Sequence, residues 1–450
     1  MQSFDTIVIG AGFAGLSAGV DLAARGVGVL VLEGRLRLGG RATSLRDRAT
    51  GELVDNGQHV LFGCYRETFQ FLRRLGVDGD VRLQATLGVD SIDRHNRRTR
   101  LECPQLPPPL HLLAGILVWD RLPVRERWAT LRMLAPLHRA RREAAGNSMP
   151  GTAPTAETVR QWLVRHGQGP LVRELLWEPL ALAALNQQPD HAAAAPFARV
   201  LAELSGFHLS DSAIGVPSRP LETLYAEPAR RFIEERGGVV RTKSPATLGV
   251  GGNGSLRVET GGEQLNARAV ISAVPWYSFR RLFETPPAVL APSLDRAEAM
   301  DGSPIVTVNL WLDRPLLPAP FLGLPGRTMQ WAFDKHAAFG GSASYLSMVA
   351  SGAAELLDLP NGDLVALATD QLRDALPSRG WRVHHASVIR EPLATFSLAP
   401  GQPPRPSTTT PVRGLFLAGD WIETGLPGTI ESAVISGHRA AAAAFRSLAS

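Results

Sequence analysis

Three glycines and one acidic residue near the N-terminus have the types and spacing that bind the pyrophosphate and ribose of a dinucleotide. They are Gly10, Gly12, Gly15 and Glu33. Gly10 permits a tight turn, Gly12 lets the backbone approach a pyrophosphate, and Gly15 lets a helix pack closely against a strand. Glu33 stands where a carboxylate binds ribose hydroxyls. This segment is therefore predicted to bind a dinucleotide.

The elements that must position these residues follow from the hydrophobic pattern. Asp5 to Ile9 and Val27 to Leu32 are predicted to be buried parallel strands, and Leu16 to Arg25 the helix between them. Phe13 and Ala14 lead into that helix, whose N-terminal amides and dipole would face the phosphates. The order of strand, turn, helix, strand and acid predicts an α/β fold with a Rossmann-like domain.

Further glycine-rich segments identify the dinucleotide through a resemblance. They are Gly39, Gly40 and Arg41 after the acid, Gly419 and Asp420 after an apolar strand, and Gly428, Thr429 and Ile430 at the start of a predicted C-terminal helix. These segments resemble the FAD motifs of the superfamily of amine oxidases and carotenoid desaturases. The resemblance implies that the C-terminal helix points at the flavin, where a helix N-terminus stabilises an anion by up to roughly 1–2 kcal/mol. It also implies an FAD site assembled from both ends of the chain.

The composition fits a two-domain enzyme that binds no nucleic acid. The 450 residues suffice for two cores, the net charge of +5 is modest, and aromatic and basic residues do not interleave. The two cysteines, Cys64 and Cys103, imply no disulfide framework, and neither lies near the C-terminal flavin motif. We therefore expect FAD to be held non-covalently. His384 and His385 have no partner at metal-ligand spacing, so no metal site is expected.

The chain is predicted to form two discontinuous domains. We expect an FAD-binding domain made of residues 1–85, 211–275 and 385–450. We expect residues 86–210 and 276–384 to form a mixed α+β substrate domain with a helical lid. The alternating pattern of Pro304 to Leu312 predicts a strand over a cavity. Trp331 and Tyr345 to Met348 are expected on neighbouring strands.

A second, narrower resemblance covers nearly the whole chain. The run from Val54 to Thr68, which contains Asp-Asn-Gly-Gln-His, is similar to the hallmark of the squalene-associated FAD-dependent desaturases. These are the hydroxysqualene dehydroxylases of bacterial hopanoid biosynthesis. Further matching segments are Trp177 to Asn186, Pro315 to Gly323, Met329 to Trp331, Arg405 to Arg413, and Gly425 to Glu431. Ala246 departs from the superfamily, which usually has Val where the backbone contacts adenine, but a backbone contact survives that change.

This resemblance implies a reductive dehydroxylation of a C30 polyprenyl alcohol. Loss of water from an allylic alcohol would leave a delocalised cation, which a hydride from reduced FAD would convert to squalene. It also implies an external reductant, such as NADPH, and neighbouring enzymes of the squalene pathway as partners. The reaction needs a dry tunnel, a proton donor, and a flavin within about 3–3.5 Å of the reacting carbon.

Several side chains are candidates for that chemistry. His59 is the first candidate for the proton donor or for a residue that positions the substrate, and it follows Gly57 and Gln58 in the sequence. A purely structural hydrogen bond of His59 explains its presence equally well. Aromatic faces attract a cation, and the candidates for this role are Trp276, Tyr277, Trp311, Trp331 and Trp421. Gly57, Gln58, His59 and Ala246 are also expected to contact FAD.

A basic segment beside an apolar one raises the question of membrane contact. Leu110 to Trp119 is apolar, and Arg121 to Arg142 holds seven arginines, the acid Glu126 and the aromatic Trp128. Such a segment can lie on an anionic leaflet, or it can form a solvated lid over the FAD domain. We expect peripheral contact with the inner face of the membrane and a cytoplasmic location.

Two other activities stay open at this point. A carotenoid-type desaturase would move hydride in the opposite direction on a similar chain. A flavin amine oxidase would commonly place a lysine near the flavin on the strand from Ser303 to Leu312, and this chain has none there.

Overall fold

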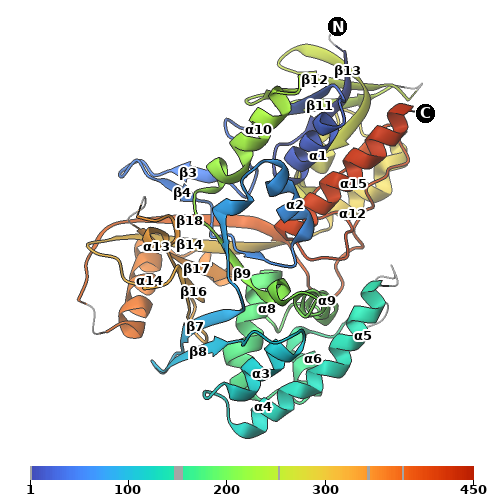
Figure 1. The fold of residues 1–450 in the computed structure, drawn as a ribbon. Helices are drawn as coiled ribbons and strands as arrows, with labels where there is room; N and C mark the ends of the chain where they lie inside the picture. The colour runs from blue at the N-terminus through green and yellow to red at the C-terminus, as the bar shows by residue number, and fades with distance from the viewer. Residues whose placement is uncertain (1–2, 146–155, 252–253, 342–344, 378–379, 450) are drawn as a thin grey trace.

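A seven-stranded sheet carries the N-terminal glycine motif (Figure 1). The computed structural model describes residues 3–145, 156–251, 254–341, 345–377 and 380–449. The strand order is β10-β2-β1-β13-β12-β11, with β19 also paired to β13. The strands of this sheet are β1 (Ser3–Ile9), β2 (Val29–Leu32), β10 (Val239–Arg241), β11 (Ala246–Val250), β12 (Leu256–Thr260), β13 (Glu263–Ser272) and β19 (Leu415–Leu417).

Both faces of this sheet are covered, which explains its apolar central strands. Strands β10, β2, β1, β13 and β19 run parallel, whereas β11, β12 and β13 form an antiparallel meander. Val8 and Val31 pack toward α1 (Phe13–Ala24), α10 (Glu227–Glu234) and α15 (Ile430–Ala449). Ile7 and Leu30 pack toward the other face, below α11 (Trp276–Phe279) and α12 (Ala291–Glu298). Parallel strands buried on both faces need such continuous apolar sequences.

The second seven-stranded sheet forms one wall of the substrate region. Its order is β18-β14-β17-β16-β15-β7-β8, and its strands are β7 (Gly88–Ile92), β8 (Arg98–Glu102), β14 (Gly302–Leu312), β15 (Phe321–Gly323), β16 (Trp331–Asp334), β17 (Tyr345–Ser351) and β18 (Val383–Phe396). One face packs on α14 (Asn361–Ala375) through Val306 and Val308. The expected strand from Pro304 to Leu312 is confirmed as part of β14, and β16 and β17 are neighbours as expected.

The described residues also form two small sheets and further helices (Figure 1). Strands β5 (Leu61–Phe62), β9 (Ile214–Pro217) and β6 (Val81–Leu83) form one small sheet, and β3 (Ser44–Arg46) and β4 (Leu53–Asp55) form another. The helices are α2 (Arg66–Arg74), α3 (Leu110–Val118), α4 (Val124–Thr130), α5 (Leu134–Ala145), α6 (Val159–Arg165), α7 (Pro170–Val172), α8 (Glu178–Leu185), α9 (Ala194–Leu204) and α13 (Lys335–Ala338). Of these, α2 packs beside α15, α13 packs beside the second large sheet, and α3 to α9 form a helical region in the lower part of the molecule (Figure 1).

The sheet pairing refines the expected boundaries. Strand β18 pairs with β14 in the second sheet, so residues 385–396 lie with the substrate region rather than with the FAD-binding sheet. Residues 214–217 belong to a small sheet between the two large ones. The chain therefore crosses between the FAD-binding region and the substrate region more often than the expected domain boundaries imply.

Candidate active site

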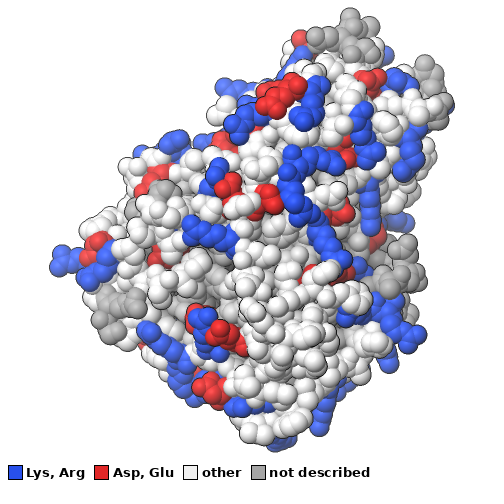
Figure 2. Space-filling view, in the orientation of Figure 1, with Lys and Arg blue, Asp and Glu red and all other residues white. Residues whose placement is uncertain are grey.

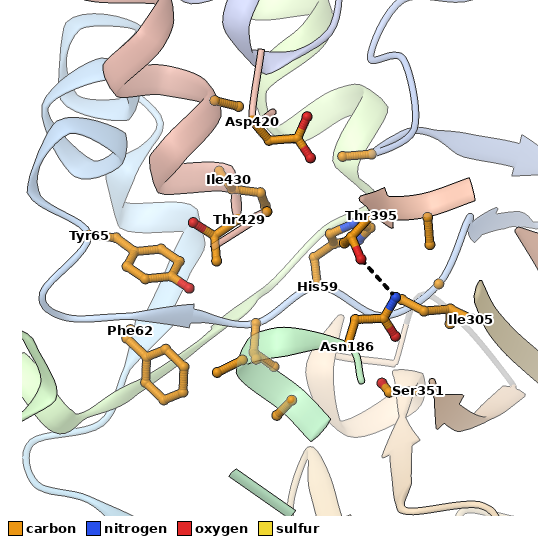
Figure 3. A pocket seen from close by; sticks show the side chains of 18 of the residues that line it. His59, Phe62, Tyr65, Asn186, Ile305, Ser351, Thr395, Asp420, Thr429 and Ile430 are labelled. Atoms are coloured by element: carbon orange, nitrogen blue, oxygen red, sulfur yellow. Dashed lines mark hydrogen bonds between the residues drawn. The ribbon is translucent and has the colours of Figure 1, made fainter. Parts of the chain in front are cut away.

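One cavity of about 930 Å³ reaches from the glycine motif to the helical region. Figure 3 shows part of it, with Thr429 and Ile430 below Asp420 and with Tyr65 and Phe62 beside Thr429. Its lining at one end is glycine backbone with a few charged groups, and at the other end it is aliphatic and aromatic side chains. A single continuous space can therefore hold a dinucleotide and an apolar substrate together.

The glycine turn after β1 is shaped for a phosphate. Gly10 has φ +105° and lies against the carbonyl of Ala273, and Gly12 precedes the first turn of α1. A Cβ on Gly15 would lie 1.8 Å from the carbonyl oxygen of Gly10, so the helix can approach the strand only with glycine there. The first amides of a helix have no partner within the helix and attract an anion.

Glu33 lies at the expected place at the end of β2. Its buried carboxylate accepts the amide N–H of Ala11 at 2.9 Å and that of Arg35 at 2.9 Å. These bonds fix the carboxylate at the edge of the cavity, where ribose hydroxyls would meet it.

Arg41 and Asp420 join the two ends of the chain across the cavity. The Arg41 guanidinium donates to Asp420 at 2.5 Å and to the carbonyl of Ala394 at 2.9 Å. Burial acts to lower the pKa of Arg41, but Asp420 outweighs it and the pKa is raised, so the guanidinium stays charged. Gly419, just before Asp420, has φ +146° and donates its N–H to Ser436 on α15.

All but one of the residues expected to bind the cofactor line this cavity. Those that do are Gly10, Gly12, Phe13, Ala14, Glu33, Gly39, Gly40, Arg41, Gly57, Gln58, His59, Ala246, Gly419, Asp420, Gly428, Thr429 and Ile430. Gly15 does not line it and serves the packing of α1 on β1. The C-terminal helix begins at Ile430, so Thr429 and Ile430 present its N-terminal end to the cavity.

Polar atoms on the His59 loop are free to meet a ligand. Gln58 donates its side-chain N–H to the carbonyl of His59, while its Oε1 has no partner among the described residues. His59 Nδ1 also lacks a partner. Burial lowers the pKa of His59; Asp55 and the Gly57 backbone oppose this, and Lys335 and Arg41 reinforce it. The imidazole is therefore neutral and can donate or accept one hydrogen bond.

A buried ion pair supports that loop from behind. Lys335 donates to Asp55 at 2.9 Å, and both side chains are almost fully buried. Asp55 also accepts the hydroxyl of Ser44 and the amide of Leu221. A buried carboxyl group with three hydrogen-bond donors holds the start of the loop in one position.

The structure separates the five aromatic candidates. Trp331, Tyr277 and Trp421 line the cavity. Trp276 and Trp311 do not: Trp276 is packed in the core beside the FAD-binding sheet, and Trp311 lies next to the tilted His385 ring and donates to Glu52 at 3.2 Å. These two candidates therefore do not reach the cavity, because β14 directs Trp311 away from it and α11 directs Trp276 into the core.

The substrate end owes its shape to a π-helical turn. Residues Arg173–Trp177 form this turn ahead of α8, and Leu175, Leu176 and Trp177 all line the cavity. Pro179, two residues later, cannot donate a backbone hydrogen bond, and wider turns of this kind frequently occur at functional sites. Three consecutive side chains therefore line the cavity, whereas in a regular α-helix only one or two of three consecutive side chains would face it.

A second π-helical turn serves the cofactor end. Residues Glu222–Ala226 precede Pro228, and Tyr225 donates its hydroxyl to the carbonyls of Gly39 and Ala42. The Tyr225 ring stacks on Phe13 with centroids 3.6 Å apart. The turn therefore holds the segment of Gly39 and Gly40 against the start of α1, which follows Gly10 and Gly12.

Several cavity residues were missed by sequence reasoning. Tyr65 was inside the recognised hallmark but carried no role, and Asn186 ended another matching segment. Glu391 accepts the amide of Asn56 at 3.0 Å and lines the cavity from β18. No motif marks Glu391, because only strand pairing across the whole chain brings it to Asn56.

The residues present fit FAD. The cavity joins all three flavin motifs, it leaves room above the glycines, and it offers unpartnered polar atoms on the His59 loop. Among the described residues, no group of three His, Cys, Asp or Glu is arranged to hold a metal ion.

Comparisons with known proteins agree with this site. Residues 13–444 match the family described as flavin containing amine oxidoreductase. A hydroxysqualene dehydroxylase of Rhodopseudomonas palustris is 31% identical and one of Sinorhizobium fredii 29% identical, each alignment covering 96% of both chains. A zeta-carotene desaturase of Zea mays is 25% identical over 97% of this chain and 82% of its own.

The fold is shared with solved structures at lower identity. An engineered putrescine oxidase is 18% identical, with a TM-score of 0.73 over 99% of both chains. From these matches and the cavity, the chain belongs to the flavin containing amine oxidoreductase family and is an FAD-dependent oxidoreductase.

Proposed function

We propose that this enzyme reduces hydroxysqualene to squalene by reductive dehydroxylation. The observation that carries the proposal is the single cavity that joins the flavin motifs to a long apolar lining. Near full-length similarity to hydroxysqualene dehydroxylases supports the same substrate class. An apolar lining stabilises a hydrocarbon chain by removing its surface from water.

Different residues of the cavity bind the cofactor, bind the substrate and stabilise charge during the reaction. Bound FAD, once reduced, supplies the hydride. The glycine turn, Glu33 and the Arg41–Asp420 pair bind and orient the cofactor, while the substrate end excludes water. The faces of Trp331 and Phe333, whose ring centroids are 6.3 Å apart, support positive charge on the allylic carbons. His59 and Gln58 position the substrate or the leaving hydroxyl.

The alternatives are weaker on specific observations. Strand β14 carries no lysine toward the flavin region, and the lysine at position 335 is held by Asp55 outside the cavity lining. Both facts disfavour an amine oxidase. A desaturase would use the same apolar cavity, so the direction of hydride transfer must be measured.

Labelled hydride decides between dehydroxylation and desaturation. Holoenzyme reduced with dithionite in deuterated water carries deuterium at the exchangeable flavin position. We expect squalene with one deuterium at the carbon that lost the hydroxyl, and one oxidised flavin per squalene formed. Unlabelled squalene would contradict the hydride step, and new conjugated double bonds with flavin becoming reduced would establish the desaturase.

We also propose that the FAD is not covalently bound. Cys64 and Cys103, the two cysteines of the chain, are both distant in sequence from the C-terminal flavin motif, and Cys64 does not line the main cavity. Acid precipitation should therefore release all the flavin into the supernatant, whereas flavin retained in the pellet would exclude this mode of binding.

The outer surface of α3, α4 and α5 fits an anionic lipid surface. Leu110, Val118, Val124, Trp128 and Leu134 are large apolar side chains exposed on α3, α4 and α5. Four exposed arginines lie on the same helices and their connection, namely Arg125, Arg132, Arg139 and Arg142. Figure 2 shows a broad uncharged area over this lower part of the molecule, with basic side chains along its edge. No helix among the described residues is long and apolar enough to cross a membrane.

This surface is tested with vesicles that contain anionic lipid. Changing the four exposed arginines to Gln should weaken sedimentation with such vesicles by about two orders of magnitude or more, because each basic residue near the surface contributes about 1 kcal/mol. The control changes four exposed arginines elsewhere, Arg48, Arg73, Arg231 and Arg257. Equal binding by both variants would instead assign the helices to a solvated lid.

A further inference from the structure

A second, smaller cavity lies beside the flavin end of the first. Its volume is about 260 Å³, and it is formed mainly between α2, α9 and the start of α15. Five residues line both cavities and form the wall between them, namely Phe62, Tyr65, Ala184, Leu204 and Thr429. The second cavity therefore ends where the N-terminus of α15 faces the flavin region.

The second cavity is lined by charged side chains as well as apolar ones, so it offers hydrogen-bonding groups to water. It includes three arginines and three glutamates, namely Arg66, Arg199, Arg439, Glu67, Glu203 and Glu431. Arg66 and Arg439 are exposed at its rim, whereas Glu431 is buried and accepts the amides of Glu67 and Thr68. Polar spaces of this size hold ordered water when several hydrogen-bonding groups surround them.

Tyr65 stands at the junction of the two cavities. Figure 3 shows its ring on the wall of the main cavity, with Thr429 close to its hydroxyl. The Thr429 side chain lies within hydrogen-bonding reach of that hydroxyl, and the Phe62 ring packs edge-on against the tyrosine at 5.8 Å between centroids. Burial raises the pKa of Tyr65, so the phenol keeps its proton at neutral pH.

The proposed reaction needs a proton and releases water in a place that the substrate fills with hydrocarbon. For each turnover, the C–O bond of the alcohol breaks, its oxygen gains one proton and leaves as water, and the carbon gains a hydride from the reduced cofactor. A substrate that occupies the apolar end blocks the path by which it entered. The proton and the water therefore need a second route.

We propose that the second cavity is a water-filled conduit between solvent and the flavin end, and that Tyr65 is the catalytic relay at its inner end. The inference rests on the proposed function. Tyr65 donates its proton to the departing hydroxyl as it receives one from water in the second cavity, so it begins and ends as a neutral phenol. The water formed leaves by the same route, past Thr429.

The first test removes the phenol hydroxyl alone. In Tyr65→Phe holoenzyme, the single-turnover rate of squalene formation should fall by about 10²-fold or more, the usual contribution of general acid catalysis. The Kd for FAD and the Kd for squalene, measured from the flavin spectrum, should change less than threefold. Tyr345→Phe is the matched control, because Tyr345 is a buried tyrosine outside the cavity whose hydroxyl donates to the carbonyl of Leu53.

The second test measures water at Tyr65 without any turnover. The chain has four tyrosines, so incorporation of 3-fluorotyrosine gives four ¹⁹F resonances, and Tyr65→Phe identifies one of them. In holoenzyme saturated with squalene, the Tyr65 resonance should still receive magnetisation from water protons. Ile435→Trp, which fills the second cavity from α15, should abolish this transfer and slow single turnover at least tenfold. Arg446→Trp on the exposed side of α15 is the control.

The outcomes separate the inference from the function. If wild-type enzyme forms no squalene, the proposed function fails, while the ¹⁹F experiment still decides whether the second cavity carries water to Tyr65. If wild-type enzyme is active and Tyr65→Phe keeps its rate within threefold, the relay is wrong. If the Tyr65 resonance receives no magnetisation from water in the squalene-saturated protein, the conduit is wrong.

Discussion

At the flavin end of the cavity the lining is mostly backbone, whereas at the substrate end it is mostly side chain. Gly10, Gly12 and Gly40 bring peptide groups to the surface, and only a few charged groups such as Glu33 and Arg41 accompany them. The substrate end is made of leucines and aromatic rings from α3, α5, the π-helical turn and the second sheet.

This difference determines how each end tolerates change. A glycine that meets backbone within 3 Å cannot be replaced without moving an element, so the flavin end depends on single positions. An apolar wall accepts exchange among side chains of similar volume. A single substitution at the flavin end should therefore abolish cofactor binding or leave it intact, whereas substitutions at the substrate end should change the activity by degrees.

The largest effect is expected at Gly15. A valine there would place its Cβ 1.8 Å from the carbonyl oxygen of Gly10. We expect Gly15→Val to destabilise the protein by about 3 kcal/mol or more and to abolish FAD binding, since such overpacking displaces α1 from β1. Flavin absorbance per protein and thermal unfolding measure both effects. Gly362→Ala is the control, because nothing lies within 4 Å of its Cβ position.

The buried ion pair behind the His59 loop should give the next largest effect. Lys335→Met leaves the buried Asp55 carboxyl group without its cation, and breaking a buried pair in this way typically costs about 3–5 kcal/mol in the free energy of unfolding. Denaturant unfolding of the holoenzyme measures this loss. Adding Asp55→Asn to the same variant should recover most of it, and failure to recover would show that the lysine acts through packing on Phe339 and Tyr345 instead.

Glu33 should affect affinity and leave the chemistry intact. Glu33→Ala removes the acceptor for the amides of Ala11 and Arg35 and the expected partner of ribose. Loss of a hydrogen bond to a charged group costs about 1.5–3 kcal/mol, so the Kd for FAD should rise roughly tenfold to a hundredfold. Turnover should recover at saturating FAD. Turnover that stays low at full occupancy would place Glu33 in the chemistry.

The smallest effect is expected at the aromatic wall. Trp331→Phe keeps an aromatic face in the cavity, so we expect only a few-fold loss of single-turnover rate with little change in stability. Trp311→Phe should do the opposite: it removes the hydrogen bond to Glu52, worth about 1 kcal/mol, and leaves the rate unchanged. A large rate loss in Trp311→Phe would contradict its position outside the cavity.

The comparison also explains what the sequence could predict. The cofactor end depends on residues close together in short motifs, so Gly10 to Glu33 and Gly419 to Ile430 could be assigned from spacing and resemblance. Whether Trp276 and Trp311 point into the cavity or away from it depends on how whole strands and helices pack. No local sequence pattern predicts that direction. Glu391 and Tyr65 reach the cavity through contacts with Asn56 and with Thr429, which lie hundreds of residues away in the chain.

The continuity of the cavity imposes an order of assembly. FAD and the hydrocarbon occupy two ends of one space, so a lipid or detergent molecule that slides into the newly folded chain can obstruct the path of the cofactor. Nascent protein made where flavin is scarce would then become trapped in a lipid-filled form that late addition of FAD rescues slowly. The supply of flavin during synthesis, rather than its affinity alone, would set the fraction of active enzyme.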